Sequence, residues 1–88
     1  MGLPRVKRSE TLGVAIKERR AALGLSQLDL ATEIGVTQGR VSRWEKGQDF
    51  PAPEFSAAVA GFLKVDLANY HHLLGLGRIW AYTRNEVS

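Results

Sequence analysis

The sequence SQLDLATEIGVTQGRVSRWEKG, residues 26–47, contains two short amphipathic segments separated by a tight turn. Ser26 followed three residues later by Asp29 matches a capping box, which predicts that a helix begins directly after Ser26. Gly35 can adopt the positive φ that ends many helices, and Thr37 can cap the helix that follows. The stretch therefore predicts two consecutive helices joined by a short turn. Their expected bounds are about 27–34 and 38–46.

Apolar residues in both segments recur at helical spacing, so each helix is expected to bury one face. The residues expected to be buried are Leu28, Ala31 and Ile34 in the first helix and Val41 and Trp44 in the second. Ala31 falls where two crossing helices approach too closely for a larger side chain, and Gly47 ends the second helix. Together these constraints predict a helix-turn-helix whose second helix stands out from the body.

The second predicted helix also has a polar face that a hydrophobic core does not require. This face carries Gln38, Gly39, Ser42, Arg43 and Lys46. Hydrogen-bonding and basic side chains on a protruding helix can enter the major groove of DNA. The polar face is therefore the candidate recognition surface.

Upstream of this pair, the sequence predicts one further amphipathic helix. Ser9 is its candidate N-cap, Leu12, Ile16 and Leu23 fall on one face, and Gly24 is expected to end it. The residues before it, 1–8, carry three basic side chains without periodicity. They are expected to form a flexible basic arm.

Two more amphipathic segments and a tail lie downstream. Pro53 suits the first turn of a fourth helix, and Asp66 can cap a fifth. The apolar faces contain Phe55, Val59, Phe62 and Leu63 in the fourth helix and Leu67, Tyr70, Leu73 and Leu74 in the fifth. The tail GLGRIWAYTRNEVS is expected to form either a short helix or an extended strand. The predicted fold class is all-α: a compact five-helix domain over residues 9–75, followed by a tail over residues 76–88.

Composition limits the classes of function. With 88 residues the chain is expected to form one domain, and without cysteine it has neither a disulfide scaffold nor a thiolate metal site. His71 and His72 are adjacent, so on a helix their side chains diverge by about 100° and cannot share a metal. No nucleophile, base and orienting group can be assembled from the other residues. We therefore expect no enzyme activity, no cofactor and no metal.

Positive charge is clustered along the chain. The formal net charge is +3, and the basic residues gather in the first twenty residues and in residues 40–46. Clustering of this kind favours a polyanionic partner, and a solvated basic surface is the alternative interpretation. No run of 18 apolar residues is present, so no membrane span is expected and a cytoplasmic location is the default.

The stretch LSQLDLATEIGVTQGRVSRWEKG resembles the lambda-repressor-like, Xre-type helix-turn-helix family. The markers are Leu-Ser-Gln at the start of the pair, the Gly-Val-Thr turn, and Val-Ser-Arg-Trp-Glu-Lys-Gly at its end. The resemblance extends from Leu12 to Leu74. It implies a compact five-helix domain that binds double-stranded DNA and regulates transcription.

The resemblance also implies roles for residues of the recognition helix. Gln38 is expected to contact a base, since Gln can bind the N6 and N7 edge of adenine through two hydrogen bonds. Arg43 is expected to reach guanine O6 and N7, with a phosphate contact or a surface ion pair as the alternative. Gly39 departs from the commoner polar residue and is either a site of close approach or a position without contact. The hydroxyl of Ser42 either reaches DNA or bonds back to its own helix.

Other family positions imply contacts with the DNA backbone. The residues expected to bind phosphate are Gln27, Thr37, Arg40, Lys46 and Arg20. Gln27 lies at the N-terminus of a helix, where exposed N–H groups add to phosphate binding. Arg20 and Glu45 match two family positions that form an ion pair between the first and third helices. On this interpretation the pair sets the angle of the recognition helix.

The tail contains three large apolar side chains, Ile79, Trp80 and Tyr82. They either complete the core of the monomer or form an exposed patch that mediates dimerisation. We expect a homodimer, because one recognition helix offers few base contacts and two copies in adjacent major grooves would read a palindromic operator. The predicted function is transcriptional repression by operator binding. The alternative is an antitoxin or protein-interaction module built on the same scaffold.

Overall fold

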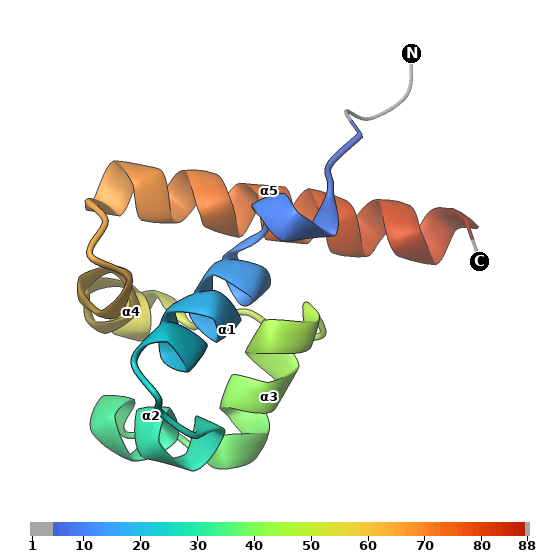
Figure 1. Cartoon of the computed structure of the whole chain (residues 1–88). Coiled ribbons are helices and arrows are strands. Elements are labelled where there is room, and N and C mark those ends of the chain that lie inside the picture. The colour runs from blue at the N-terminus through green and yellow to red at the C-terminus, as the bar shows by residue number, and fades with distance from the viewer. Residues whose placement is uncertain (1–4, 88) are drawn as a thin grey trace.

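The computed structural model describes the backbone of residues 5–87 and the side chains of residues 5–83. Within this part the chain is helical, and no strand is present (Figure 1). The α-helices are α1 (Leu12–Ala22), α2 (Gln27–Ile34), α3 (Gln38–Lys46), α4 (Ser56–Leu63) and α5 (Leu67–Val87), with 3-10 turns η1 (Arg8–Glu10) and η2 (Pro53–Phe55). The predicted all-α class with five helices is confirmed. Residues 1–4 of the predicted arm and residue 88 of the predicted tail lie outside the described part.

The helices pack around one core beneath α5. In Figure 1, α5 runs along one edge of the molecule, α1 lies in the middle, and α2 and α3 lie at the opposite edge. The buried core draws on all five α-helices. Its members are Leu12, Ile16, Leu30, Ala31, Val41, Trp44, Val59, Ala60, Tyr70 and Leu74.

The helix pair α2–α3 begins at the capping box that the sequence indicates. The Ser26 hydroxyl accepts a hydrogen bond from the Asp29 N–H at 3.0 Å, and Asp29 Oδ2 accepts one from the Ser26 N–H at 2.9 Å. The backbone N–H of Ser26, and then its hydroxyl, lower the pKa of Asp29 below its ordinary value. Gly35 ends α2 with a φ of 92°. Both helices have the bounds that their capping and turn residues suggest.

The start of α1 differs from the expectation. Ser9 is not the N-cap, because it lies inside η1, and α1 begins at Leu12 after an extended Thr11. The Thr11 hydroxyl donates a hydrogen bond to the Arg8 carbonyl at 2.7 Å. Together with the bond from the Thr11 N–H to the same carbonyl at 3.1 Å, it closes the 3-10 turn before α1 starts.

Three leucines assigned to buried faces are exposed instead. Leu23, Leu28 and Leu67 keep 47%, 58% and 51% of their surface accessible. In α2 the buried residue is Leu30, which lies next to Ala31 on the face that meets the core. Leu28 and Leu30 both fit an apolar stripe with Ala31, and only the packing of α2 on its neighbours selects between them. The three assignments are therefore corrected.

The tail forms neither a separate short helix nor a strand. α5 continues as one helix of 21 residues through Gly75 and Gly77. Gly77 is buried, and a β-carbon there would lie 3.3 Å from Cε1 of Phe50. Burying the Phe50 ring against the helix outweighs the cost of about 1 kcal/mol that a glycine imposes on a helix.

The C-terminal end of α4 provides a test of local strain. Lys64 is the one non-glycine residue with positive φ in the described chain, with φ 58° and ψ 42°. A side chain in this conformation costs about 1–2 kcal/mol, which glycine does not pay. We therefore expect Lys64→Gly to raise the free energy of unfolding by about 1 kcal/mol in urea titrations.

The matched control is Lys17→Gly, an exposed lysine within α1. Glycine there should lower the free energy of unfolding by about 1 kcal/mol, because it adds backbone entropy to the unfolded chain. Equal losses of stability in the two variants would show that the positive φ of Lys64 does not destabilise the fold.

Candidate nucleic-acid interface

The candidate interface is the exposed face of α3, and the two ends of this helix are defined by short-range hydrogen bonds. Thr37 Oγ1 accepts a bond from the Arg40 N–H at 3.2 Å. At the other end Gly47 has a φ of 74°, and its N–H donates to the Trp44 carbonyl at 3.2 Å. Val41 and Trp44 are buried on one side of the helix. α3 is therefore fixed along its inner face and free along its outer face.

The outer face of α3 carries the side chains expected to read DNA. Gln38, Gly39, Arg40, Arg43 and Lys46 are exposed, and Ser42 is half-buried. Arg43 lies back along the helix, so that its Nη1 is 3.5 Å from the point that a β-carbon on Gly39 would occupy. The glycine thus leaves room for the guanidinium of Arg43. The structure places this predicted set together on one surface.

A buried carboxylate holds α3 against α1 and α2. Glu45 of α3 keeps only 4% of its surface accessible. Arg20 of α1 donates two bonds to it, from Nε to Oε2 at 2.7 Å and from Nη2 to Oε1 at 3.0 Å. Gln27 of α2 adds a third bond, from Nε2 to Oε1 at 3.0 Å. The side chain of Glu45 thereby connects α3 to both α1 and α2.

The surroundings of Arg20 keep it charged and oriented. Its hydrogen bonds to Glu45 raise the pKa of the guanidinium above its ordinary value, and partial burial acts in the opposite direction. Its Nη1 also donates to the Leu25 carbonyl at 2.9 Å, in the turn between α1 and α2. Arg20 and Gln27 are thus engaged with protein atoms. Each keeps further N–H groups, so the phosphate contacts expected of them stay predictions.

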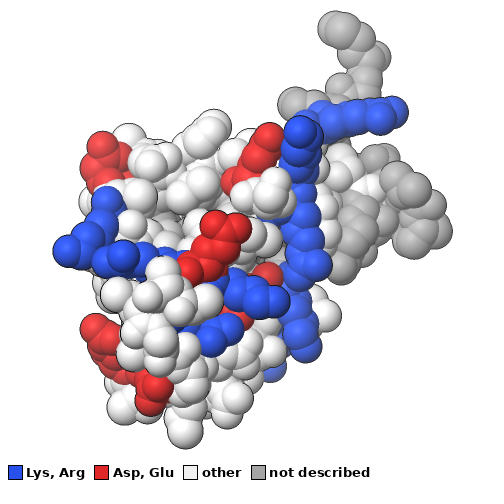
Figure 2. Space-filling view, viewed as in Figure 1, with Lys and Arg blue, Asp and Glu red and all other residues white. Residues whose placement is uncertain are grey.

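Basic side chains extend from the N-terminal segment towards α3. Figure 2 shows Lys and Arg in a row down the side of the molecule where these two parts lie. In the N-terminal segment Arg5, Lys7 and Arg8 are exposed, and the basic residues of α3 are exposed as well. Acidic side chains are scattered over the same face, and one group lies beside the upper part of the row (Figure 2). The positive row is suited to a polyanion that lies along α3.

Gly13 of α1 is a site residue that the sequence interpretation missed. It is buried, and a β-carbon there would overlap the Trp44 carbonyl oxygen and lie 2.9 Å from the Glu45 carbonyl oxygen. α1 and α3 therefore touch through their backbones. A glycine inside an amphipathic helix signals such a close approach, and that signal was present in the sequence.

The residues expected at a dimer interface differ in exposure. Ile79 and Trp80 are half-buried, whereas Tyr82 keeps 59% of its surface accessible. Trp80 packs within its own chain, with the guanidinium carbon of Arg8 at 5.6 Å from its ring centroid. Of the three, Tyr82 is the one most available to a second copy.

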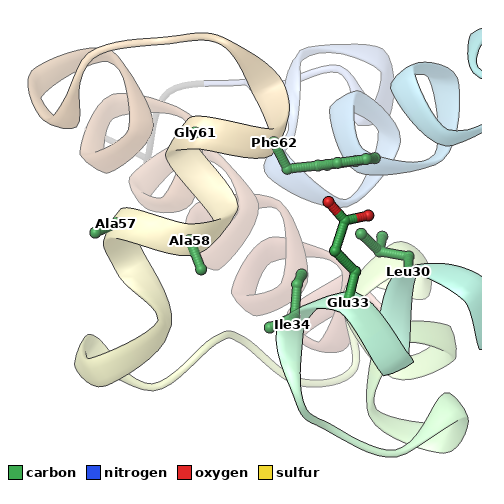
Figure 3. Close-up of a pocket in the computed structure, with 7 residues that line it drawn as sticks. All are labelled: Leu30, Glu33, Ile34, Ala57, Ala58, Gly61 and Phe62. Carbon is green, nitrogen blue, oxygen red and sulfur yellow. The ribbon is translucent and has the colours of Figure 1, made fainter.

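A pocket of about 340 Å³ lies between α2 and α4 (Figure 3). It is lined by Leu30, Glu33, Ile34, Ala57, Ala58, Gly61 and Phe62. Among the side chains of residues 5–83, no group of three His, Asp or Glu could hold a metal ion. In the same part of the chain, none of the helices combines the length and the apolar character that crossing a membrane requires.

The fold is that of helix-turn-helix proteins of the lambda-repressor-like class. A sequence model described as helix-turn-helix matches residues 16–69, and the chain belongs to this family. The resemblance inferred from the sequence is confirmed. The family and its solved members below are DNA-binding regulators and not enzymes. A search of curated proteins found no match.

Two solved proteins illustrate the similarity. The P22 c2 repressor, solved in complex with a synthetic operator, is 27% identical, with a TM-score of 0.62; the match covers 68% of this chain and 91% of that one. The clp gene regulator ClgR from Corynebacterium glutamicum is 26% identical, with a TM-score of 0.62. That match covers 94% of this chain and 87% of the regulator.

Proposed function

We propose that this chain is a sequence-specific regulator of transcription that binds double-stranded DNA by inserting α3 into the major groove. The observation that carries the proposal is the division of α3 into two faces. Val41, Trp44 and Glu45 are buried, while the opposite face exposes polar and basic side chains. The P22 c2 repressor, which shares the fold, was solved on an operator.

In this proposal the outer face reads the bases. Gln38 at the start of α3 forms two hydrogen bonds with adenine, and Arg43 forms two with guanine. Gly39 allows the helix backbone to approach the base edges closely while leaving space for Arg43. The half-buried Ser42 contributes its hydroxyl at the margin of this surface.

Contacts with phosphate fix the register of the helix on the duplex. Arg40 and Lys46 are exposed beside the base-reading residues and are suited to this role. The hydroxyl of Thr37 accepts the cap bond and still has a proton to donate. Gln27 and Arg20 contribute the N–H groups that neither Glu45 nor the Leu25 carbonyl accepts.

We further propose that the chain represses transcription as a homodimer on a palindromic operator. Two copies of α3, about 34–36 Å apart, would enter successive major grooves on one side of the duplex. The exposed Tyr82 and the half-buried Ile79 supply apolar surface on α5 for this contact. Occupying the operator excludes polymerase without requiring any further domain.

Selection of bound duplexes from a random pool tests the proposal, and Arg43→Ala tests the base contact. The wild type should prefer the selected duplex over one in which the contacted guanine is replaced by another base. We expect Arg43→Ala to lose about 1–3 kcal/mol of this preference, roughly 5- to 150-fold in relative affinity. Affinity for random DNA should change much less. Fluorescence anisotropy at fixed salt gives both affinities, which depend steeply on ionic strength.

Arg40→Ala is the matched control, an exposed arginine on the same helix. It should weaken binding to the selected and random duplexes by the same factor. Equal losses on both duplexes for Arg43→Ala would remove it from the base-reading set. Failure of the wild-type protein to retain any duplex at low salt would overturn the proposed function and favour a protein-interaction role.

A further inference from the structure

The C-terminal end of α3 rests against the side chain of Trp80 in α5. A β-carbon on Gly47 would lie 2.8 Å from Cζ3 of Trp80 and 3.2 Å from Cε3. The six-membered ring of the indole therefore sits directly on the backbone that ends α3. Gly47 satisfies two requirements at this point, because its φ of 74° also disfavours any other residue.

Trp80 also contacts the N-terminal segment. The guanidinium carbon of Arg8 lies 5.6 Å from the ring centroid, at cation–π distance. Arg8 begins η1, whose 3-10 turn is closed by the Thr11 hydroxyl. The indole is thus in contact with the segment before α1 and with the end of α3.

A second contact joins the segment after α3 to α5. Phe50 packs on Gly77, and the guanidinium carbon of Arg78 lies 5.7 Å from the Phe50 ring centroid. Gly77 and Trp80 are three residues apart and so share one face of α5. The chain leaving α3 therefore meets α5 at two points along this face.

We propose that Trp80 is a positioning residue for α3: it sets where the C-terminal end of this helix lies relative to α5, and Arg8 keeps the indole in place. The effect on DNA recognition rests on the proposed function, in which α3 is the helix that reads DNA. α3 is held from two directions, by Glu45 on the side of α1 and α2 and by Gly47 on the side of α5. Recognition then depends on a residue that touches no base.

The first test needs no DNA. The N–H groups of Gly47 and Gln48 donate to the carbonyls of Trp44 and Arg43, so their hydrogen exchange reports on the end of α3. In Trp80→Ala we expect both amides to exchange at least about tenfold faster than in the wild type. The Gly35 amide, which caps α2 through the Ala31 carbonyl, should be unaffected.

Two variants separate positioning from a general loss of α5. Trp80→Phe keeps an aromatic ring and should restore most of the protection. His72→Ala removes an exposed ring from the same helix and should leave both amides unchanged. Unaltered exchange in Trp80→Ala, or equal effects of Trp80→Ala and His72→Ala, would overturn the proposal. If Trp80→Ala does not fold, Trp80→Phe and Arg8→Gln must show a smaller acceleration confined to Gly47 and Gln48.

The second test measures DNA discrimination on the selected duplex. A displaced α3 should lower the ratio of selected to random affinity by about 2- to 30-fold in Trp80→Ala, with partial recovery in Trp80→Phe. An unchanged ratio would remove the link to recognition. If the wild type binds no duplex while the exchange difference is present, the proposed function fails and the positioning role stands.

Discussion

Arg20→Met is expected to lower the free energy of unfolding by about 3–5 kcal/mol, because it leaves the Glu45 carboxylate buried without its cation. Glu45 is 4% exposed and would keep only the bond from Gln27. Met matches the length of the arginine stem and lacks the guanidinium, so the loss mainly reports the charge and its hydrogen bonds. A domain of this size has about 5–15 kcal/mol of stability, so urea titration at low temperature is the suitable measurement.

Arg19→Met is the matched control. Arg19 is half-buried and its Nε donates to the neutral Phe62 carbonyl at 3.2 Å. Loss of this bond should cost about 1 kcal/mol. The double variant Arg20→Met with Glu45→Met should recover much of the stability, because it removes the unpaired charge. If Arg20→Met costs no more than Arg19→Met, Glu45 is not held in the way the hydrogen bonds indicate.

Gly13→Ala is expected to lower the free energy of unfolding by about 2–3 kcal/mol, although alanine favours helices by about 1 kcal/mol. The new β-carbon would overlap the Trp44 carbonyl oxygen. Its neighbours are backbone atoms of α3, which cannot turn away as a flexible side chain can. Relief therefore requires α1 and α3 to move apart, and DNA binding should weaken together with stability.

Gly61→Ala controls for the effect of alanine on helix propensity. Gly61 lies inside α4, and a β-carbon there would meet no atom within 4 Å. This variant should gain about 0.5–1 kcal/mol. Thermal denaturation followed by circular dichroism should thus show opposite shifts for the two glycines. Shifts of the same sign would show that the contact between α1 and α3 is looser than the structure indicates.

Local signals predicted much of the helix-turn-helix. A capping box, a turn glycine and a hydroxyl cap act over a few residues, so the bounds of α2 and α3 follow from Ser26, Gly35, Thr37 and Gly47. Helical spacing further indicated which side chains share the outer face of α3, and the resemblance implied their roles. These are short-range features that do not depend on how the rest of the chain packs.

Long-range packing accounts for what the sequence interpretation missed. Leu28 and Leu30 fit the same periodic pattern, and the position of α2 on the core decides that Leu30 is buried. Similarly, Gly77 lowers helix propensity, yet the ring of Phe50 packs on it and α5 continues. The contact between Trp80 and Gly47 joins residues 33 positions apart, which no local pattern reports.

The space beside Gly39 has a consequence for re-engineering the protein. A side chain added there would point to solvent, with only the movable Nη1 of Arg43 within 4 Å. An alanine or serine library at this position could therefore be screened for altered target preference without repacking the interior. Gly39 is thus a position on the outer face of α3 where a side chain can be added.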